Sequence, residues 1–162
     1  MKMHIAIAVA LIGTAWTGLA QSSANLTLSG TVVNNTSIAV AEQAGYNALP
    51  IEAGCVDQTV ANVTEKSNSR TGYSVVLSSL NAGTGSQAFL KGATAGNADT
   101  VNYSIKYQGV SVSLSSGEAE VTTATARTSQ AGVTKTLAVT VPASWVNTDT
   151  YSDTLTLTIA AN

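Results

Sequence analysis

The sequence of 162 residues is short of the side chains on which most enzyme chemistry depends. Its one histidine, His4, lies in an N-terminal segment that is expected to be removed, and its one cysteine, Cys55, has no partner for a disulfide within the chain. Without histidine, a Ser-His-Asp triad, a Cys-His pair and a histidine-ligated metal site are excluded from the mature chain. We therefore expect no enzymatic activity, no cofactor and no metal.

Charged residues are also scarce, with seven Lys and Arg and nine Asp and Glu making up 10% of the chain. So few bases cannot form the positive surface that nucleic acid requires, and low charge with 44% apolar residues is unlike a disordered chain. The abundant residues are instead small and polar, namely 18 Ser, 23 Thr, 11 Asn and 13 Gly. Because β-branched Thr suits a half-exposed strand, this composition favours a nearly neutral, β-rich domain.

Long hydrophobic runs are missing as well. The apolar stretch from Ile5 to Ala15 follows Lys2, and its 11 residues would cover only about half of a roughly 30 Å hydrocarbon core. Small residues at Gly18 and Ala20 fit cleavage before Gln21. We predict that residues 1–20 are a secretory signal peptide, so that the chain meets a membrane only during export, and that the rest forms one domain.

Alternation with a period of two dominates the sequence from Asn25 onward. Gln108-Gly109 separates two such runs, at residues 101–107 and 110–114, and this spacing predicts a hairpin. Gly45 and Pro50 limit residues 41–48 to at most a helical turn. Short strands are predicted at residues 56–63, 73–80, 101–107, 110–114, 119–125, 137–141 and 155–159. This pattern predicts an all-β fold, specifically an immunoglobulin-like β-sandwich.

The first segment of the expected mature chain, residues 25–33, has one apolar and one polar face. Leu26, Leu28, Gly30 and Val32 alternate with Asn, Thr, Ser and Thr. Glycine within a strand commonly marks a place where another group approaches the backbone closely. Burial of the three large apolar side chains would contribute roughly 5 to 9 kcal/mol before the cost of ordering. Two interpretations are open: an ordinary first strand of the chain's own sheet, or a strand that docks into another molecule.

Both ends of the expected mature chain resemble a known family. The run Leu26-x-Leu28-x-Gly30-x-Val32-Val33-Asn34 resembles the start of bacterial chaperone–usher pilins. Residues 149–159, in which a Tyr-x-Asp-Thr turn precedes alternating Leu and Thr, are similar to the closing strand of the spore coat protein U-like pilins. The cysteine pair usual in such pilins is absent, and Ser37 and Leu80 stand near its expected positions.

The resemblance implies an incomplete sandwich that is completed by donor-strand exchange. It divides the chain into the signal peptide, a donor extension at residues 21–35 and a pilin-like domain at residues 36–162. Leu26, Leu28, Gly30 and Val32 would be the donor residues. The strand that borders the acceptor groove would carry Leu155, Leu157 and Ile159.

The resemblance also implies partners and a location. The partners would be identical or related pilin subunits, a periplasmic chaperone and an outer-membrane usher. The subunit would pass through the periplasm to a fimbria or coat on the cell surface, where it would support adhesion or biofilm formation.

A second function class is a secreted, self-complete immunoglobulin-like module that recognises glycan or protein through its loops. Trp145, the only Trp of the expected mature chain, is expected to cap the core near a loop rather than to stack on a sugar. The carboxylate pairs Glu118 with Glu120 and Asp149 with Asp153 are interpreted as a solvated strand edge and a turn, not as acid–base or calcium sites.

Overall fold

The computed structural model describes residues 22–162, so the predicted signal peptide lies outside the described residues. Within the described range the chain forms antiparallel strands and no helix, which confirms the expectation of an all-β fold. It follows that no helix in this range meets the length and hydropathy of a membrane span. The described chain divides into two units between Val32 and Val33, and all of its strands belong to the second unit.

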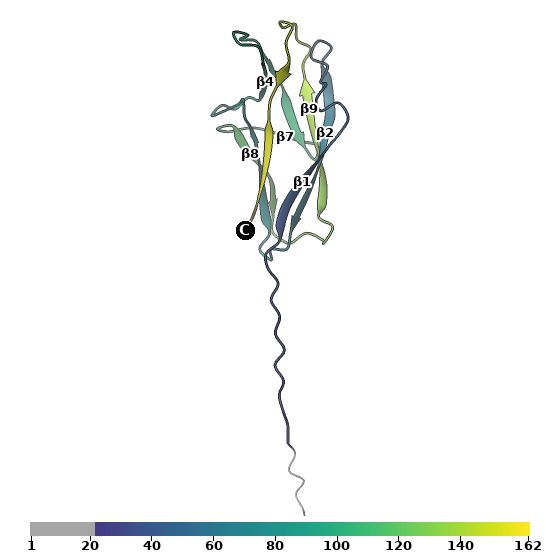
Figure 1. Ribbon diagram of the computed structural model, residues 1–162, viewed down its shortest axis with the longest axis vertical. Coiled ribbons are helices and arrows are strands. Elements are labelled where there is room, and N and C mark those ends of the chain that lie inside the picture. The colour runs from purple at the N-terminus through teal and green to yellow at the C-terminus, as the bar shows by residue number, and fades with distance from the viewer. Residues whose placement is uncertain (1–21) are drawn as a thin grey trace, which may run out of the picture. The chain divides into compact units, whose positions relative to one another are not determined.

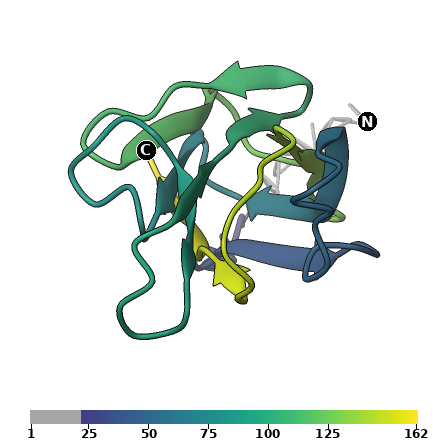
Figure 2. The same cartoon turned by 90° about the horizontal axis from the view of Figure 1, so that it is seen from above.

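Most strands lie in two antiparallel sheets that are consistent with a β-sandwich (Figure 1). The larger sheet has the order β1 (Thr36–Glu42), β2 (Cys55–Ser67), β9 (Val133–Val141), β6 (Ser104–Tyr107) and β7 (Val110–Val112). The second has the order β11 (Leu155–Ala161), β3 (Tyr73–Ser79) and β8 (Glu118–Ala124). A small third sheet has the order β10 (Tyr151–Ser152), β4 (Phe89–Gly92) and β5 (Thr100–Asn102). Figure 2 shows the strands end-on.

The hydrophobic core is built from alternate residues of these strands, as the period of two predicts. Val63 on β2, Leu77 on β3, Val101 on β5 and Val139 on β9 belong to one buried cluster. Residues of all three sheets therefore contribute to one core.

The first and last strands lie at edges. Within the described chain β1 is hydrogen-bonded only to β2, and β11 only to β3. The two strands are nevertheless neighbours, because some of their Cα atoms approach within 8 Å. Each strand thus has an unpaired side next to the other, and we call this place the β1–β11 edge.

The alternation predicted one continuous strand at residues 101–107. The structure instead divides this run at Tyr103 into β5 and β6. These two strands pair with β4 and β9 respectively, so the chain changes sheets here. The backbone at the break is satisfied, because Tyr103 N donates to Ala88 O (3.1 Å) and Gln87 Nε2 donates to Tyr103 O (2.8 Å). The residues on one face of this alternation, Val101, Tyr103, Ile105 and Tyr107, are all buried.

The predicted hairpin is confirmed. Tyr107 pairs with Val110, and the intervening Gln108 and Gly109 have φ angles of 51° and 78°. Two consecutive residues with positive φ are typical of the two-residue turns that connect antiparallel strands. At residues 41–48 the structure has the end of β1 followed by a turn and no helix.

Candidate functional site

Residues 25–33, hereafter the extension, form neither helix nor strand. The side chains of Leu26, Leu28 and Val32 are 83%, 85% and 87% exposed, and no atom lies within 4 Å of the position that a Cβ would take at Gly30. The first strand begins only at Thr36, so the extension is not the first strand of the chain's own sheet. Within residues 22–162, this alternating apolar segment therefore belongs to no sheet.

Asn68 fixes the last residue of the extension and the connection to β1 to the domain. Its Oδ1 accepts a hydrogen bond from Asn35 N (2.7 Å), and its Nδ2 donates to Val33 O (2.8 Å). The backbone N of Asn68 also donates to Asn35 O (3.1 Å). Consequently only residues 34 and 35 separate the extension from β1.

The inward face of β11 is incompletely covered. Leu155, Leu157 and Ile159 are half-buried and alternate with exposed Thr side chains. In the neighbouring strand β3, by contrast, Val75 and Leu77 are fully buried. The sequence thus placed Leu155, Leu157 and Ile159 correctly on one face, and this face lies at the β1–β11 edge.

The facing strand contributes two more apolar side chains to this edge. Ile38 on β1 is half-buried against the core, and Val40, two residues further on the same face, is 51% exposed. Paired strands lie about 4.8 Å apart, so a strand hydrogen-bonded to both β1 and β11 requires about 9.6 Å between them. Since the two strands approach more closely than that in places, they would have to separate to admit a strand.

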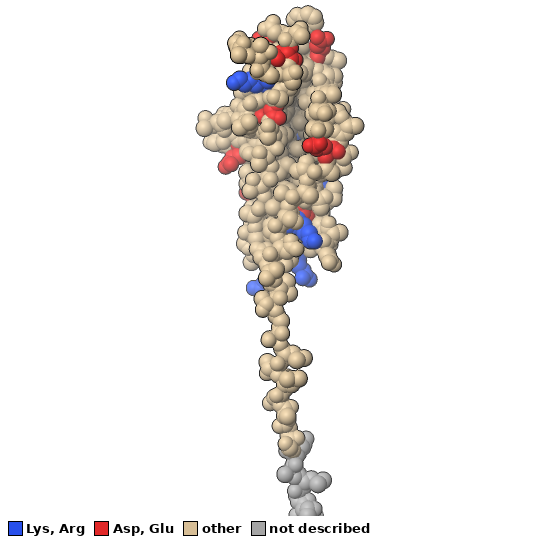
Figure 3. All heavy atoms as spheres, viewed as in Figure 1, with Lys and Arg blue, Asp and Glu red and all other residues tan. Residues whose placement is uncertain are grey.

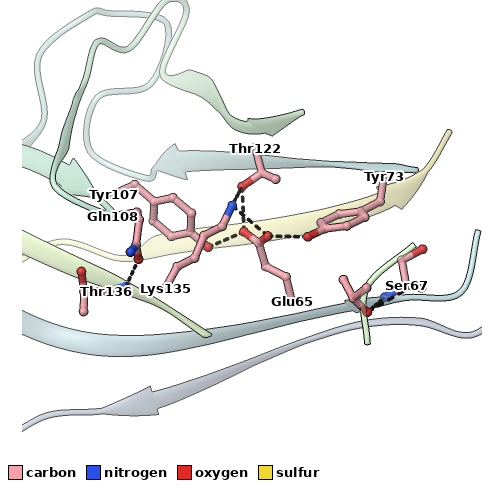
Figure 4. Close-up of polar contacts among 9 residues, drawn as sticks. Glu65, Ser67, Tyr73, Tyr107, Gln108, Thr122, Lys135 and Thr136 are labelled. Atoms are coloured by element: carbon pink, nitrogen blue, oxygen red, sulfur yellow. Dashed lines mark hydrogen bonds and ion pairs between the residues drawn. The ribbon is translucent and has the colours of Figure 1, made fainter. Parts of the chain in front are cut away.

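A second cluster, which sequence reasoning missed, is a polar network inside the core (Figure 4). The carboxylate of Glu65 on β2 is fully buried and lies 3.0 Å from Lys135 Nζ. It accepts hydrogen bonds from the hydroxyls of Tyr73 (3.0 Å), Tyr107 (2.6 Å) and Thr122 (2.8 Å). Tyr73 and Thr122 belong to the second sheet, so the network connects the two larger sheets through the core.

The electrostatics of this network keep Glu65 ionised. Burial by itself would raise the pKa of Glu65, but hydrogen bonds from Tyr107, Thr122 and Lys135, with the charge of Lys135, outweigh it and lower the pKa. Burial and the adjacent carboxylate raise the pKa of Tyr73 to about 12. A buried carboxylate with four protein donors has a structural role, and its signal in the sequence was its place in the inward alternation of Ala61, Val63 and Glu65.

The first carboxylate pair lies where the sequence predicted, on a solvated strand, but the second does not share a turn. Glu118 and Glu120 are exposed on β8. Asp149 and Asp153 lie on either side of β10, and Asp153 is half-buried and accepts hydrogen bonds from the hydroxyls of Ser79 (2.6 Å) and Tyr103 (2.6 Å). Asp149 accepts hydrogen bonds from Asn97 Nδ2 (2.7 Å) and Thr94 N (2.9 Å), which lower its pKa to about 2. Within residues 22–162 no three His, Cys, Asp or Glu side chains gather as metal ligands would.

The expectation that Trp145 caps the core is wrong, because its side chain is 91% exposed. β9 ends at Val141, and Pro142 follows. Ser144 N then donates to Ile51 O (2.9 Å), which holds this segment against the loop before β2. Trp145 therefore projects from a loop at the end of the domain. Cys55, at the start of β2, is half-buried against the core with a free thiol.

Comparison with known proteins gives no family. No protein-family model matches the chain, and no curated protein sequence matches it significantly.

Proposed function

We propose that the chain is an exported structural subunit of a fimbria or surface coat that polymerises by strand donation. The extension of one subunit inserts at the β1–β11 edge of the next and completes an immunoglobulin-like sandwich. One observation carries the proposal: the same chain holds an unpaired edge with half-covered apolar side chains and an exposed segment with matching alternation.

Two kinds of contact would hold the strand. The unpaired backbone groups of β1 and β11 would supply main-chain hydrogen bonds, and apolar contacts would set the register. Leu26, Leu28 and Val32 are almost fully exposed in the free extension, so their burial would contribute roughly 5 to 9 kcal/mol before the cost of ordering. Gly30 would allow the extension to pass close to the neighbouring backbone.

The contact is head-to-tail, because the extension and the edge are different parts of the same chain. A heterologous contact that does not close into a ring generates a filament. An unpaired apolar edge is prone to aggregation before assembly, and temporary cover by a periplasmic chaperone during transfer to an outer-membrane usher fits this need.

A second candidate function is that of a binding module for glycan or protein. The almost fully exposed Trp145 favours it, because an aromatic side chain on a loop is a common contact for ligands. Under this alternative the domain is stable and complete without the extension.

The proposal is tested with a chain that begins at Asn34 and a synthetic peptide of residues 25–33. We expect the peptide to bind and to raise the yield of folded protein on refolding, measured by fluorescence anisotropy and circular dichroism. A peptide with Leu28→Asp should lose at least about tenfold in affinity, because a charge would be buried, whereas Thr27→Asp on the polar face should bind almost normally. A shortened chain that is fully folded alone and ignores the peptide would contradict strand donation and favour the binding module.

A further inference from the structure

The two ends of the domain carry opposite charge. β2 runs from Cys55 at one end to Ser67 at the other, so residues near its two ends are far apart. Lys66 lies at the Ser67 end, Arg70 follows in the next loop, and Arg127 precedes Thr128, whose backbone N donates to Ser67 O (2.9 Å). We call this place the cationic end.

The opposite end carries carboxylates and Trp145. Glu52 lies in the loop before Cys55 and is exposed. Asp99 accepts a hydrogen bond from Asn147 N (2.8 Å), two residues before Asp149, and so joins two neighbouring loops. We call this the acidic end. In Figure 3 most blue side chains lie toward the lower part of the domain, although one lies in the upper part, and red side chains predominate in the upper and middle parts.

The cationic end has room for a partner and charge to attract one. A cavity of about 570 Å³ opens there, lined by Lys66, Arg127 and polar side chains that include Asn35 and Asn68. In the described part of the chain, the ion pairs are Lys106 with Asp57 and Lys135 with Glu65. The three cations of the cationic end are therefore not neutralised within the chain.

The short connection after the extension determines which end of the donor faces the acceptor. Residues 34 and 35 span at most about 7 Å, and Asn35 is hydrogen-bonded to Asn68 at the cationic end. Wherever the extension leaves the acceptor, the cationic end of the donor must therefore lie close by.

The direction in which the extension inserts determines which end of the acceptor meets the cationic end of the donor. β11 begins at Leu155, near the acidic end, and finishes beside Gly72, whose backbone O accepts from Asn162 N (3.0 Å) at the cationic end. An extension antiparallel to β11 leaves the acceptor at its acidic end, so opposite charges meet. A parallel extension would leave at the cationic end and place cations against cations. The charges therefore favour the antiparallel direction.

We propose that the cationic end of each subunit binds the acidic end of the subunit that accepts its extension, and that this contact steers and orients strand donation. The occupant is a second copy of this chain. Lys66, Arg70 and Arg127 would lie against Glu52, Asp99 and Asp149, and a guanidinium would stack on the exposed Trp145. This inference rests on the proposed strand donation and adds the partner surface and its polarity.

The test measures the rate of assembly of the chain that begins at Gln21, by light scattering at several salt concentrations. The double variant Lys66→Glu/Arg127→Glu should assemble about tenfold more slowly at low salt, because steering by opposite charges is lost. The difference should largely vanish near 0.5 M salt, where screening is strong, as expected from a Debye length of a few ångströms. Lys91→Glu is the control of opposite expectation, since this exposed cation pairs with Thr100 and Ser152 beside the acidic end, where a further negative charge would favour the contact. It should not slow assembly.

A second experiment restores opposite charges across the contact by changing the acceptor. Subunits with Lys66→Glu/Arg127→Glu should donate faster to acceptors with Glu52→Lys than to unmodified acceptors, because opposite charges again meet. Glu52 makes no side-chain hydrogen bond or ion pair among the described contacts, so its replacement leaves the loops intact.

The outcomes separate this contact from strand donation itself. If the double variant assembles at the unmodified rate at low salt while the extension peptide still binds the shortened chain, the end-to-end contact is overturned and strand donation stands. If the peptide does not bind, both proposals fail. If Trp145→Ala abolishes binding of a glycan but leaves assembly unchanged, Trp145 belongs to a ligand site and not to this contact.

Discussion

Glu65 is the residue on which the core depends most. A buried ion pair need not make a protein more stable than well-packed apolar residues would, but removal of one partner is costly because a charge is left buried without compensation. Here the carboxylate also accepts hydrogen bonds from Tyr73, Tyr107 and Thr122, so its loss would leave several donors unsatisfied. In a domain without an internal disulfide, this network fixes the two larger sheets against each other.

Glu65 should make the stability of the domain depend on pH. Its pKa is lowered in the folded state, so below its usual value of about 4.5 the unfolded chain binds the proton more readily and acid favours unfolding. The contribution is present above that pH and is lost as pH falls through the lower pKa of the folded state. Urea unfolding between pH 3 and 7 should show this loss. Asp149, with a pKa near 2, adds to the same trend at lower pH.

The variant Glu65→Gln should flatten this pH dependence and lower the free energy of unfolding by about 3 kcal/mol, because Lys135 is left without its counter-charge. We expect a value at the lower end of the usual range, since 18% of the Lys135 side chain is exposed. Glu118→Gln, on an exposed strand position, should change neither quantity. An unchanged pH profile in Glu65→Gln would contradict this role.

At the scale of single elements, strand donation requires an edge that can accept a strand. Val40 lies on the inward face of β1 and is half exposed, whereas the next residue, Ala41, points to the other face. Val40→Asp should therefore reduce polymer yield at least about tenfold, because the inserted strand would bury the new charge. Ala41→Asp should leave the yield almost unchanged. Sedimentation measures the polymer, and equal losses in both variants would argue against insertion at this edge.

Alternation in the sequence predicted most of the strands because burial of one face imposes a period of two. It predicted strands at the positions of β2, β3, β8, β9 and β11 and the turn at Gln108-Gly109. The predicted ranges did not include β1, β4 or β10, and the division at Tyr103 was not predicted. Strands as short as β4 and β10 carry little pattern, and the change of sheet at Tyr103 depends on tertiary pairing. The alternation also missed the polar network of Glu65, whose partners come from distant strands.

At the candidate site, the sequence did not determine what the extension pairs with or in which direction Trp145 points. Alternation indicated that residues 25–33 suit a strand, but the pattern is the same for a strand within the chain and for one given to a neighbour. The outward direction of Trp145 depends on the contact between Ser144 and Ile51, which is remote in sequence. The sequence placed Leu155, Leu157 and Ile159 on one face of a strand because they alternate with Thr.

At the scale of the whole molecule, the low content of charged residues suits a subunit that accepts a strand. Charged side chains are a usual means of preventing edge-to-edge association, and the facing strands of the β1–β11 edge carry one charged side chain between them, Glu42. In a solitary domain such an edge would be a liability. In a subunit that accepts a neighbour's strand it is an advantage.

The most direct measurement compares two chains of nearly the same composition. In one, the chain begins at Gln21; in the other, residues 25–33 are moved to follow Asn162 through a short linker, so that the segment can turn back beside β11. Mass in solution is measured by light scattering over a range of concentrations. We predict polymers that grow with concentration for the first chain and a monomer, more resistant to urea, for the second. If the chain that begins at Gln21 is itself a stable monomer at all concentrations, and moving the extension does not stabilise it, strand donation is contradicted.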